Sequence, residues 1–553
     1  MVYDDGTMKT TQENHTIISS ARIYINGRRI WLFWAGTLAT VLGVCSQIST
    51  FISAASLRYK MVGMPMGYLM LTGMAFIVVG IVLACLGLVP SVRTFRTDPS
   101  GGDHSEMSLG SGTLDNTALS AFHWKMLAVL SFALMIDAMK PATIGFIMPG
   151  VCAEYGISKE VGVLLPLAAL TGIVLGSILW GYFGDYIGRR RSILLACLMF
   201  IGTSGCGAMP TFGWNVVMCF FMGASAGGLL PVVYALLVET VPARYRGGIL
   251  VLVGGIGSVG GYLMAAVFAA VLEPHFGWRI MWFLGLPTGM LLVVLNRYIP
   301  ESPRFLVSAR RMDEAYGVVA KRRSVTNSGA AARSVHKDAS GHRRHVQLSR
   351  LLDGNLSTIT ASLNCFAITW GLVSFGFIFW LPMILHLNGL GIHASNAILA
   401  NSAIISFAGI PFASWLYYRW SARLTLVMFA MSMVSALVIF GWFEKSLMMD
   451  TNGLMAVLVV LLISTNCVGS MLLPYSSELY PSNVRSSGVG FVAGSGKLGG
   501  FVGLGLSTIV LMSGVAVFAT AIAVPALIAT TVLGYARLEE KRAGSKNGAS
   551  TND

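Results

Sequence analysis

Fourteen apolar runs, each long enough to cross a lipid bilayer, dominate this sequence of 553 residues. A spanning helix needs about 20 apolar residues, because the hydrocarbon core is about 30 Å thick. Only 11% of the residues are charged, whereas a soluble domain carries roughly 25%. The chain is therefore predicted to be an all-α polytopic membrane protein, with helices near residues 30–57, 63–90, 123–150, 161–184, 192–210, 214–240, 247–272, 279–299, 358–385, 394–418, 423–441, 453–479, 486–511 and 514–536.

Basic residues lie mainly in alternate connections between these runs. Arg28 and Arg29, Arg189 to Arg191 and the loop 304–350 all fall on one side, and the turns on the other side are short and weakly charged. Because basic loops stay in the cytoplasm, both termini are predicted to be cytoplasmic in a cell (plasma or inner) membrane. This bias accounts for the formal net charge of +14, so no nucleic-acid partner is expected.

The eight cysteines are scattered singly, and the sequence holds no CxxC pair or Cys/His cluster. Neither a disulfide framework nor a metal site is indicated. No catalytic triad or phosphate-binding loop stands out, so we expect no cofactor and no enzymatic activity.

An internal repeat divides the chain. The segment ETVPARYRGGILVLVGGIGSVGGY begins at Glu239, and ELYPSNVRSSGVGFVAGSGKLGGF begins at Glu478. Their ungapped alignment also pairs Arg246 with Arg485. Two copies of a six-helix unit are typical of transporters built from parallel repeats, which place the substrate path at the repeat interface near the bilayer midplane.

The predicted organisation places an extra transmembrane hairpin before the two six-helix repeats. Its parts are a cytoplasmic tail 1–29, the accessory hairpin 30–90, a flexible linker 91–121, the N-terminal half 122–303, a basic loop 304–356, the C-terminal half 357–536 and a cytoplasmic tail 537–553. The hairpin carries no ionisable residue in its helix interiors. We expect it to contact the outside of the bundle or another membrane protein.

Both repeat copies contain GxGxxG, at Gly255–Gly260 and Gly494–Gly499. As a dinucleotide fingerprint this motif needs a preceding strand in a βαβ unit, but here it lies inside a predicted spanning helix. Small residues at this spacing let membrane helices approach closely. Helix packing is therefore the predicted role.

The segment GYFGDYIGRRR, residues 181–191, joins two predicted spans through a short turn. It resembles the loop signature of the major facilitator superfamily, and PESPRFL, residues 300–306, resembles the branch of sugar porters and their organic-ion and aromatic-acid relatives. The resemblance implies alternating access between two six-helix halves. It also implies a cytoplasmic gate or latch made by Gly181, Asp185, Gly188, Arg189, Arg190, Glu239, Arg246, Glu478 and Arg485.

Several positions depart from the family pattern. Arg419 stands where the second-half copy of the loop would have its aspartate, and Cys219 stands where an arginine is usual in the fourth family helix. The paired glutamines of sugar porters are absent from NCFAITWGLVSFGFIFWLP, and the GPxxGG signature of drug/proton antiporters is absent from GSVGGY. A sugar is therefore not the expected substrate.

Asp137 and Lys140 lie inside the apolar stretch LMIDAMKPATIGFIMP. Charges at the membrane centre cost a few kcal/mol on insertion scales, so they usually mark ion or substrate pathways. Asp137 matches the acids of proton-coupled relatives in position, and the two residues are predicted to couple transport to protons. A structural Asp–Lys pair that only satisfies itself remains the alternative.

Lys497, also near mid-membrane, is predicted to bind an anionic substrate, because related organic-anion transporters often carry a cation there. The alternative is a packing lysine that pairs with Asp137 across the two halves. Four further candidates for the substrate site are Asn364, Trp370, Asn401 and Asn466, each of which could equally serve helix packing.

These features predict a secondary active transporter that moves a small organic acid, a carboxylate of aromatic or other type, together with protons. Its expected partners are that substrate, protons and the lipid bilayer. Two alternatives stay open. One is a facilitator or exporter of neutral or cationic compounds, and the other is a non-transporting receptor or scaffold with a transporter fold.

Overall fold

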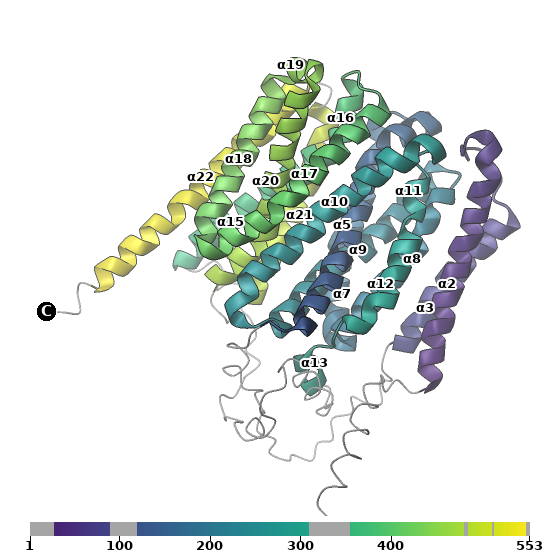
Figure 1. Cartoon of the computed structure of the whole chain (residues 1–553), viewed down its shortest axis with the longest axis horizontal. Coiled ribbons are helices and arrows are strands. Elements are labelled where there is room, and N and C mark those ends of the chain that lie inside the picture. Colours follow the sequence, from purple (N-terminus) through teal and green to yellow (C-terminus); the bar gives the residue numbers. More distant parts are fainter. Residues whose placement is uncertain (1–26, 89–118, 309–353, 481–484, 511–513, 549–553) are drawn as a thin grey trace, which may run out of the picture.

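This computed structural model describes residues 27–88, 119–308, 354–480, 485–510 and 514–548, which form helices joined by turns and short connections (Figure 1). Fourteen of these helices or helix runs are long and apolar enough to cross a membrane, which confirms the predicted all-α membrane fold. Most of the predicted tails, linker and basic loop lies outside the described residues.

Six spans make up the N-terminal half. One of them is a helix that continues as a 3-10 turn, and another is a pair of short helices that follow each other directly. The bounds are α5 (Ala121–Tyr155), α7 (Leu164–Ile187) preceded by α6 (Lys159–Gly162), α8 (Arg189–Gly202) with η3 (Thr203–Ala208), α9 (Phe212–Thr240), α10 (Ala243–Phe276), α11 (Ile280–Phe283) with α12 (Gly285–Leu295) and η4 (Asn296–Tyr298), and then the short α13 (Pro303–Ser308).

Six further spans make up the C-terminal half, and the first of them changes its winding in mid-membrane. The bounds are α15 (Gly354–Gly371), η6 (Leu372–Phe377), η7 (Ile378–Trp380) and α16 (Leu381–Leu387) in that first span, then α17 (Ile392–Arg419), α18 (Ala422–Trp442), the short α19 (Glu444–Met449), α20 (Thr451–Leu479), α21 (Arg485–Val510) and α22 (Val515–Gly548). Helix α22 runs past its predicted end at residue 536, because ARLEEKR after Tyr535 consists of strong helix formers.

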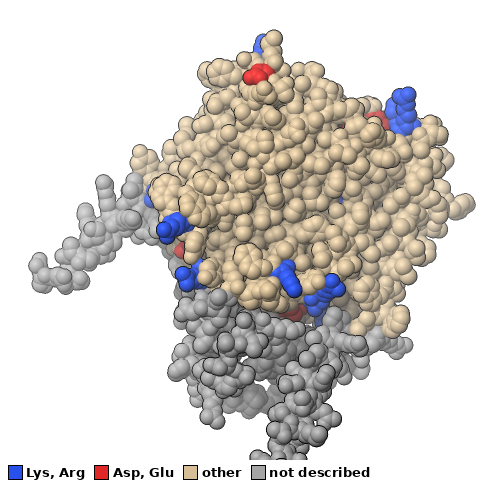
Figure 2. Space-filling model, viewed as in Figure 1, with Lys and Arg blue, Asp and Glu red and all other residues tan. Residues whose placement is uncertain are grey.

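The two halves stand side by side, with α10 packed on α17 and α20, and α5 packed on α16 (Figure 1). We call the end of the bundle that carries the α7–α8 turn the Arg189 end, and the opposite end, where α5 finishes, the Glu154 end. Figure 2 shows basic side chains gathered at the lower rim beside the grey segments and an almost uncharged band above them. This band matches the apolar belt that a bilayer requires.

Five of the six glycines of the two GxGxxG motifs lie on helix–helix contacts, and Gly494 is the exception. Glycines that follow the motifs lie on such contacts too. A methyl group added to Gly261 would meet the backbone of α5 at Met135 and Met139, and one added to Gly503 would meet the backbone of η6 at Gly376. Gly499 lies directly against the backbone of α15 at Ile368. Each copy of the repeat thus uses its glycines to pack one helix on the first helix of its half, and the structure supports the packing interpretation of both motifs.

We expect Gly261→Val to destabilise the protein, because its side chain would overlap the α5 backbone 2.6 Å from the Met135 carbonyl oxygen. Overpacking of this kind costs roughly 1–3 kcal/mol. The matched control is Gly494→Val, since nothing lies within 4 Å of a methyl group at Gly494. Thermal unfolding of the two variants in detergent micelles tests the contact, and equal melting temperatures would contradict it.

The extra hairpin, α2 (Gly27–Ser53) and α3 (Tyr68–Leu88), packs against α8 and η3 on the outer side of the N-terminal half (Figure 1). Its two helices touch through glycines, because a methyl group on Gly36 or Gly43 would overlap the α3 backbone. The buried Gln47 donates from Nε2 to the carbonyl oxygen of Met70 at 2.8 Å. The hairpin is therefore a closely packed unit attached to the bundle through its other face.

Candidate functional site

Asp137 lies at the middle of the central helix α5, as residue 17 of 35. Its side chain is 9% exposed, and its Oδ1 has no hydrogen-bond partner among the described residues. An unpaired carboxylate oxygen in such surroundings is costly to bury, because it has lost its hydration without gaining a donor. The arrangement is therefore expected only where the carboxyl group binds a proton, water or a ligand.

Lys497 lies at the middle of α21, as residue 13 of 26, and belongs to the opposite half. Its charge interacts with that of Asp137, although no ion pair within 4 Å joins the two side chains. The structure thus brings two of the predicted residues together across the interface between the halves. Opposite charges that are close without direct contact can both act on a molecule held between them.

Lys140 points elsewhere. Its ammonium group is fully buried inside the N-terminal half, where Nζ lies 3.4 Å from both Ser204 Oγ and the carbonyl oxygen of Trp282. It also lies 5.1 Å from the centre of the Phe200 ring, at a distance that suits a cation–π contact. No hydrogen bond or ion pair joins Lys140 to Asp137. The structure therefore does not place Lys140 in the space between Asp137 and Lys497.

Two of the four polar candidates contact residues next to Lys497 on α21. Asn364 Oδ1 accepts a hydrogen bond from Ser495 Oγ at 2.6 Å. The Trp370 ring lies against Gly496, and its Nε1 donates to the carbonyl oxygen of Thr465 at 2.9 Å. Asn466 of α20 donates to the carbonyl oxygen of Leu462 in its own helix at 2.8 Å.

Asn401 does not join this group. It is exposed on α17, on the helix face that also carries the exposed apolar side chains of Ile404, Ile405 and Phe412. A face of this kind is suited to lipid contact. The structure therefore gives Asn401 no place beside the other candidates.

The Arg189 end holds the residues predicted to form the gate. Arg189 pairs with Glu239 at 3.3 Å and donates from Nη1 to the carbonyl oxygen of Gly184 at 3.0 Å. Arg246 donates to Val241 at 3.3 Å. The side chains of Asp185 and Arg485 lie outside what the structure describes, so the inter-half latch predicted for them stays a prediction.

Glu301, the acid of the motif PESPR, has a structural role that its motif did not predict. Glu301 Oε1 accepts from the backbone N–H of Arg189 at 2.7 Å and of Arg190 at 3.2 Å, and so caps the start of α8. Burial raises the pKa of the Glu301 carboxyl above its ordinary value, while these N–H donors oppose that rise. Gly188 has φ +101° and faces Glu301 closely, so a side chain there would be strained and would displace the carboxylate.

Two further hydrogen bonds at this end join different helices, one within the C-terminal half and one between the halves. Glu478 accepts a hydrogen bond from the Tyr417 hydroxyl at 3.1 Å, within the C-terminal half. Ser414 Oγ donates to the carbonyl oxygen of Gly248 at 2.9 Å, which joins α17 to α10 of the other half.

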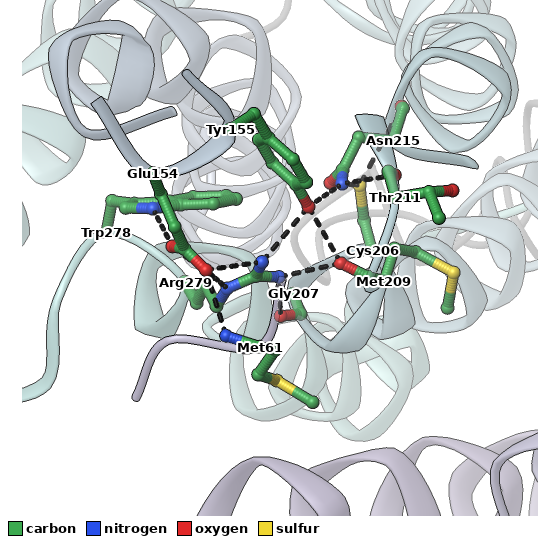
Figure 3. Close-up of polar contacts among 10 residues, drawn as sticks. All are labelled: Met61, Glu154, Tyr155, Cys206, Gly207, Met209, Thr211, Asn215, Trp278 and Arg279. Atoms are coloured by element: carbon green, nitrogen blue, oxygen red, sulfur yellow. Dashed lines mark hydrogen bonds and ion pairs between the residues drawn. The ribbon is translucent and has the colours of Figure 1, made fainter. Parts of the chain in front are cut away.

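A buried ion pair near the Glu154 end was also missed from the sequence (Figure 3). Arg279, 1% exposed, pairs with Glu154 at 2.9 Å and donates to the carbonyl oxygens of Gly207 and Met209. Trp278 Nε1 donates to the same carboxylate at 2.7 Å. The network therefore ties together the ends of α5, η3 and the segment before α11.

The hairpin takes part in this network, since the backbone N–H of Met61 donates to Glu154 Oε1 at 2.9 Å (Figure 3). Arg58 and Tyr59 precede it with φ +51° and +61°, values that are uncommon for residues other than glycine. The Tyr59 ring stacks on Phe51 at 4.8 Å between ring centres. This turn holds the hairpin against the bundle by polar as well as apolar contacts.

The two halves meet closely at the Glu154 end. Glu273 of α10 accepts a hydrogen bond from Asn396 of α17, and both side chains are buried. A methyl group on Gly145 of α5 would overlap the carbonyl oxygen of Phe379 in η7. One apolar core spans both halves here, with Val151 and Ile384 among its members. The structure therefore closes this end above the Asp137–Lys497 pair.

These features define a membrane protein of two six-helix halves, with charged side chains held at mid-membrane between them. Residues 126–504 match the family model described as Major Facilitator Superfamily. The chain belongs to this superfamily of transporters, and the resemblance drawn from the sequence motifs is confirmed. The hairpin α2–α3 lies outside the matched region.

Among curated proteins, the chain is 27% identical over 392 residues to a niacin transporter of Acinetobacter baylyi, covering 70% of this chain and 87% of that protein. It is 26% identical to a 4-hydroxybenzoate transporter of Pseudomonas putida, covering 75% and 93%, and 22% identical to a benzoate transport protein of Acinetobacter baylyi, covering 70% and 84%. Among solved structures, a proton:xylose symporter bound to 6-bromo-6-deoxy-D-glucose shares the fold, with a TM-score of 0.60, 17% identity and coverage of 75% and 95%.

Proposed function

We propose that this protein is a secondary active transporter that moves a small aromatic carboxylate together with protons. The observation that carries the proposal is the pair of Asp137 and Lys497, which belong to opposite halves and interact through their charges at mid-helix. The ammonium group of Lys497 would bind the carboxylate, and the carboxyl group of Asp137 would bind the proton. The names of the relatives, which include niacin, benzoate and 4-hydroxybenzoate transporters, support this substrate class.

Alternating access couples the two events. A proton on Asp137 removes the charge that otherwise holds Lys497, and so frees Lys497 to bind the substrate anion. Trp370 and Asn364, which lie around Lys497, would then contact the ring and its polar substituents. Asn466 would line the same space from α20. The basic rim at the Arg189 end supports a cytoplasmic location for that end and for both termini.

Uptake by purified protein in liposomes tests this proposal. Radiolabelled nicotinate, benzoate and 4-hydroxybenzoate would each be supplied outside, with the interior one pH unit more alkaline. Protein-free liposomes give the background, because the neutral acids cross lipid unaided. We expect protein-dependent accumulation of at least one acid and none of a quaternary ammonium compound. Uptake of the cation alone would favour the facilitator or exporter, and binding without flux would favour a receptor.

Replacing Lys497 by alanine should weaken carboxylate binding by about 1.5–3 kcal/mol, the range for a hydrogen bond to a charged group. Isothermal titration of the purified protein with benzoate measures this loss. Lys125→Ala is the matched control, because Lys125 is an exposed lysine of α5 near the Arg189 end. If Lys497→Ala and the control bind benzoate equally well, Lys497 is a packing residue.

A further inference from the structure

A cavity of about 580 Å³ lies at the Glu154 end, between the two halves. Its walls come from the end of α5, from residues 157–163 with α6, from the end of η7 and α16, and from α21. Pro149 in its wall is 12 residues past Asp137 on α5, or about 18 Å along the helix axis. The cavity is therefore separate from the Asp137–Lys497 pair.

The contact between Gly145 and Phe379 lies between this cavity and the central pair. Gly145 is one helical turn before Pro149, and Phe379 is followed by Trp380, which lines the cavity. Because the α5 and η7 backbones touch there, no side chain can be inserted at Gly145 without moving them apart. The contact therefore separates the cavity from the central pair.

The lining of the cavity suits an aromatic acid. Trp380, Met383 and Val163 supply apolar contact, and the exposed Lys159 supplies a positive charge at the rim. His386 places Nδ1 3.1 Å from the carbonyl oxygen of Leu390. In the tautomer that donates this bond, Nε2 is left as an acceptor for a hydroxyl group of a ligand.

Glu160, which follows Lys159 and also lines the cavity, is hydrogen-bonded to another residue. The Glu160 carboxylate accepts a hydrogen bond from the Ser158 hydroxyl and also interacts with the charge of Lys159. Both charges are exposed, so solvent screens them. The attraction that Lys159 exerts on an anion at the rim is therefore modest, as a site for first capture requires.

We propose that this cavity is a second, outer binding site for the aromatic carboxylate, in which Lys159 binds the carboxylate group and Trp380 and Met383 contact the ring. The inference rests on the proposed function, and it adds Lys159, Trp380 and Met383 as residues that bind the substrate first. Bound substrate would then reach Lys497 when the Gly145–Phe379 contact opens.

The test is the initial rate of benzoate uptake into intact cells that express each variant. Lys159→Gln should raise the KM about two- to fivefold, as expected for an exposed ion pair, and leave the maximal rate unchanged. Lys159→Arg should restore the wild-type KM. The matched control is Lys445→Gln, which removes an exposed lysine of α19 at the same end of the bundle.

Calorimetric titration with benzoate distinguishes the two proposals. The wild-type protein should show two binding events. Lys497→Ala should weaken one of them and leave the other unchanged, and adding Lys159→Gln should weaken that other event about two- to fivefold. An unchanged KM in Lys159→Gln, or a single binding event in the wild type that Lys497→Ala weakens and Lys159→Gln leaves unchanged, would overturn the outer site and leave the proposed function intact. If the wild-type protein neither binds nor transports any of the three acids, both proposals fall.

Discussion

Replacing Asp137 by asparagine should abolish the protein-dependent accumulation of substrate that a pH difference drives. One pH unit is worth about 1.4 kcal/mol per proton, which allows up to about tenfold accumulation for a single coupled proton. Asparagine has a similar shape but cannot take up a proton, so accumulation should fall to the background of protein-free liposomes. Liposome uptake with an alkaline interior measures this accumulation.

The same Asp137→Asn variant should still exchange external substrate for substrate loaded inside, since exchange needs no net proton movement. This second assay separates a coupling defect from a folding defect. Asp450→Asn is the matched control, because Asp450 is an exposed acid before α20. Undiminished accumulation by Asp137→Asn would show that another group carries the proton.

Replacing Arg279 by alanine should destabilise the protein by roughly 3–5 kcal/mol, the range observed when one partner of a buried ion pair is removed. The substitution would leave the Glu154 carboxylate buried without its counter-charge, and would remove the Arg279 donor from the carbonyl oxygens of Gly207 and Met209, of which Met209 keeps the Tyr155 hydroxyl. Chemical denaturation in lipid nanodiscs measures the free energy of unfolding.

The double variant Glu154→Leu with Arg279→Met is the informative control for this ion pair. It removes both charges and keeps most of the side-chain volume, so it should be more stable than Arg279→Ala alone. If Arg279→Ala is as stable as the wild type, the Glu154–Arg279 pair contributes nothing to the stability of the fold.

The spans and the repeat could be predicted from the sequence because the bilayer imposes its thickness on every apolar run. Asp137 and Lys497 could be found for the same reason, since a charge inside such a run is rare enough to be noticed. Their approach across the interface could be suspected only from the repeat. It depends on packing between helices that are 360 residues apart in the sequence.

The direction of the Lys140 side chain could not be predicted. Residues three apart on a helix lie on neighbouring faces, so spacing alone favours a pair with Asp137. The long side chain of Lys140 instead reaches Ser204 and Trp282, which a sequence pattern does not place beside it.

Glu154 and Arg279 were missed for a different reason. Both fall at the ends of predicted spans, where charged residues are ordinary and usually solvated. Their contact joins residues 125 positions apart, so only the packed structure separates a buried pair from two exposed charges. The role of Glu301 could not be predicted either. Its motif is visible in the sequence, but its capping of α8 depends on the conformation of Gly188.

The attachment of the hairpin has a consequence for the order of biosynthesis. Helices α2 and α3 leave the ribosome before α8, since about a hundred residues separate Leu88 from Arg189. The glycine contacts between α2 and α3 need no later part of the chain, so the pair can assemble in the lipid at once. When α5 emerges, its Glu154 carboxylate can accept the hydrogen bond from the Met61 amide. When α8 and η3 follow, they can pack against the outer face of the assembled pair. From this order we expect the hairpin to give α8 and η3 a packing surface that is already assembled when they enter the membrane.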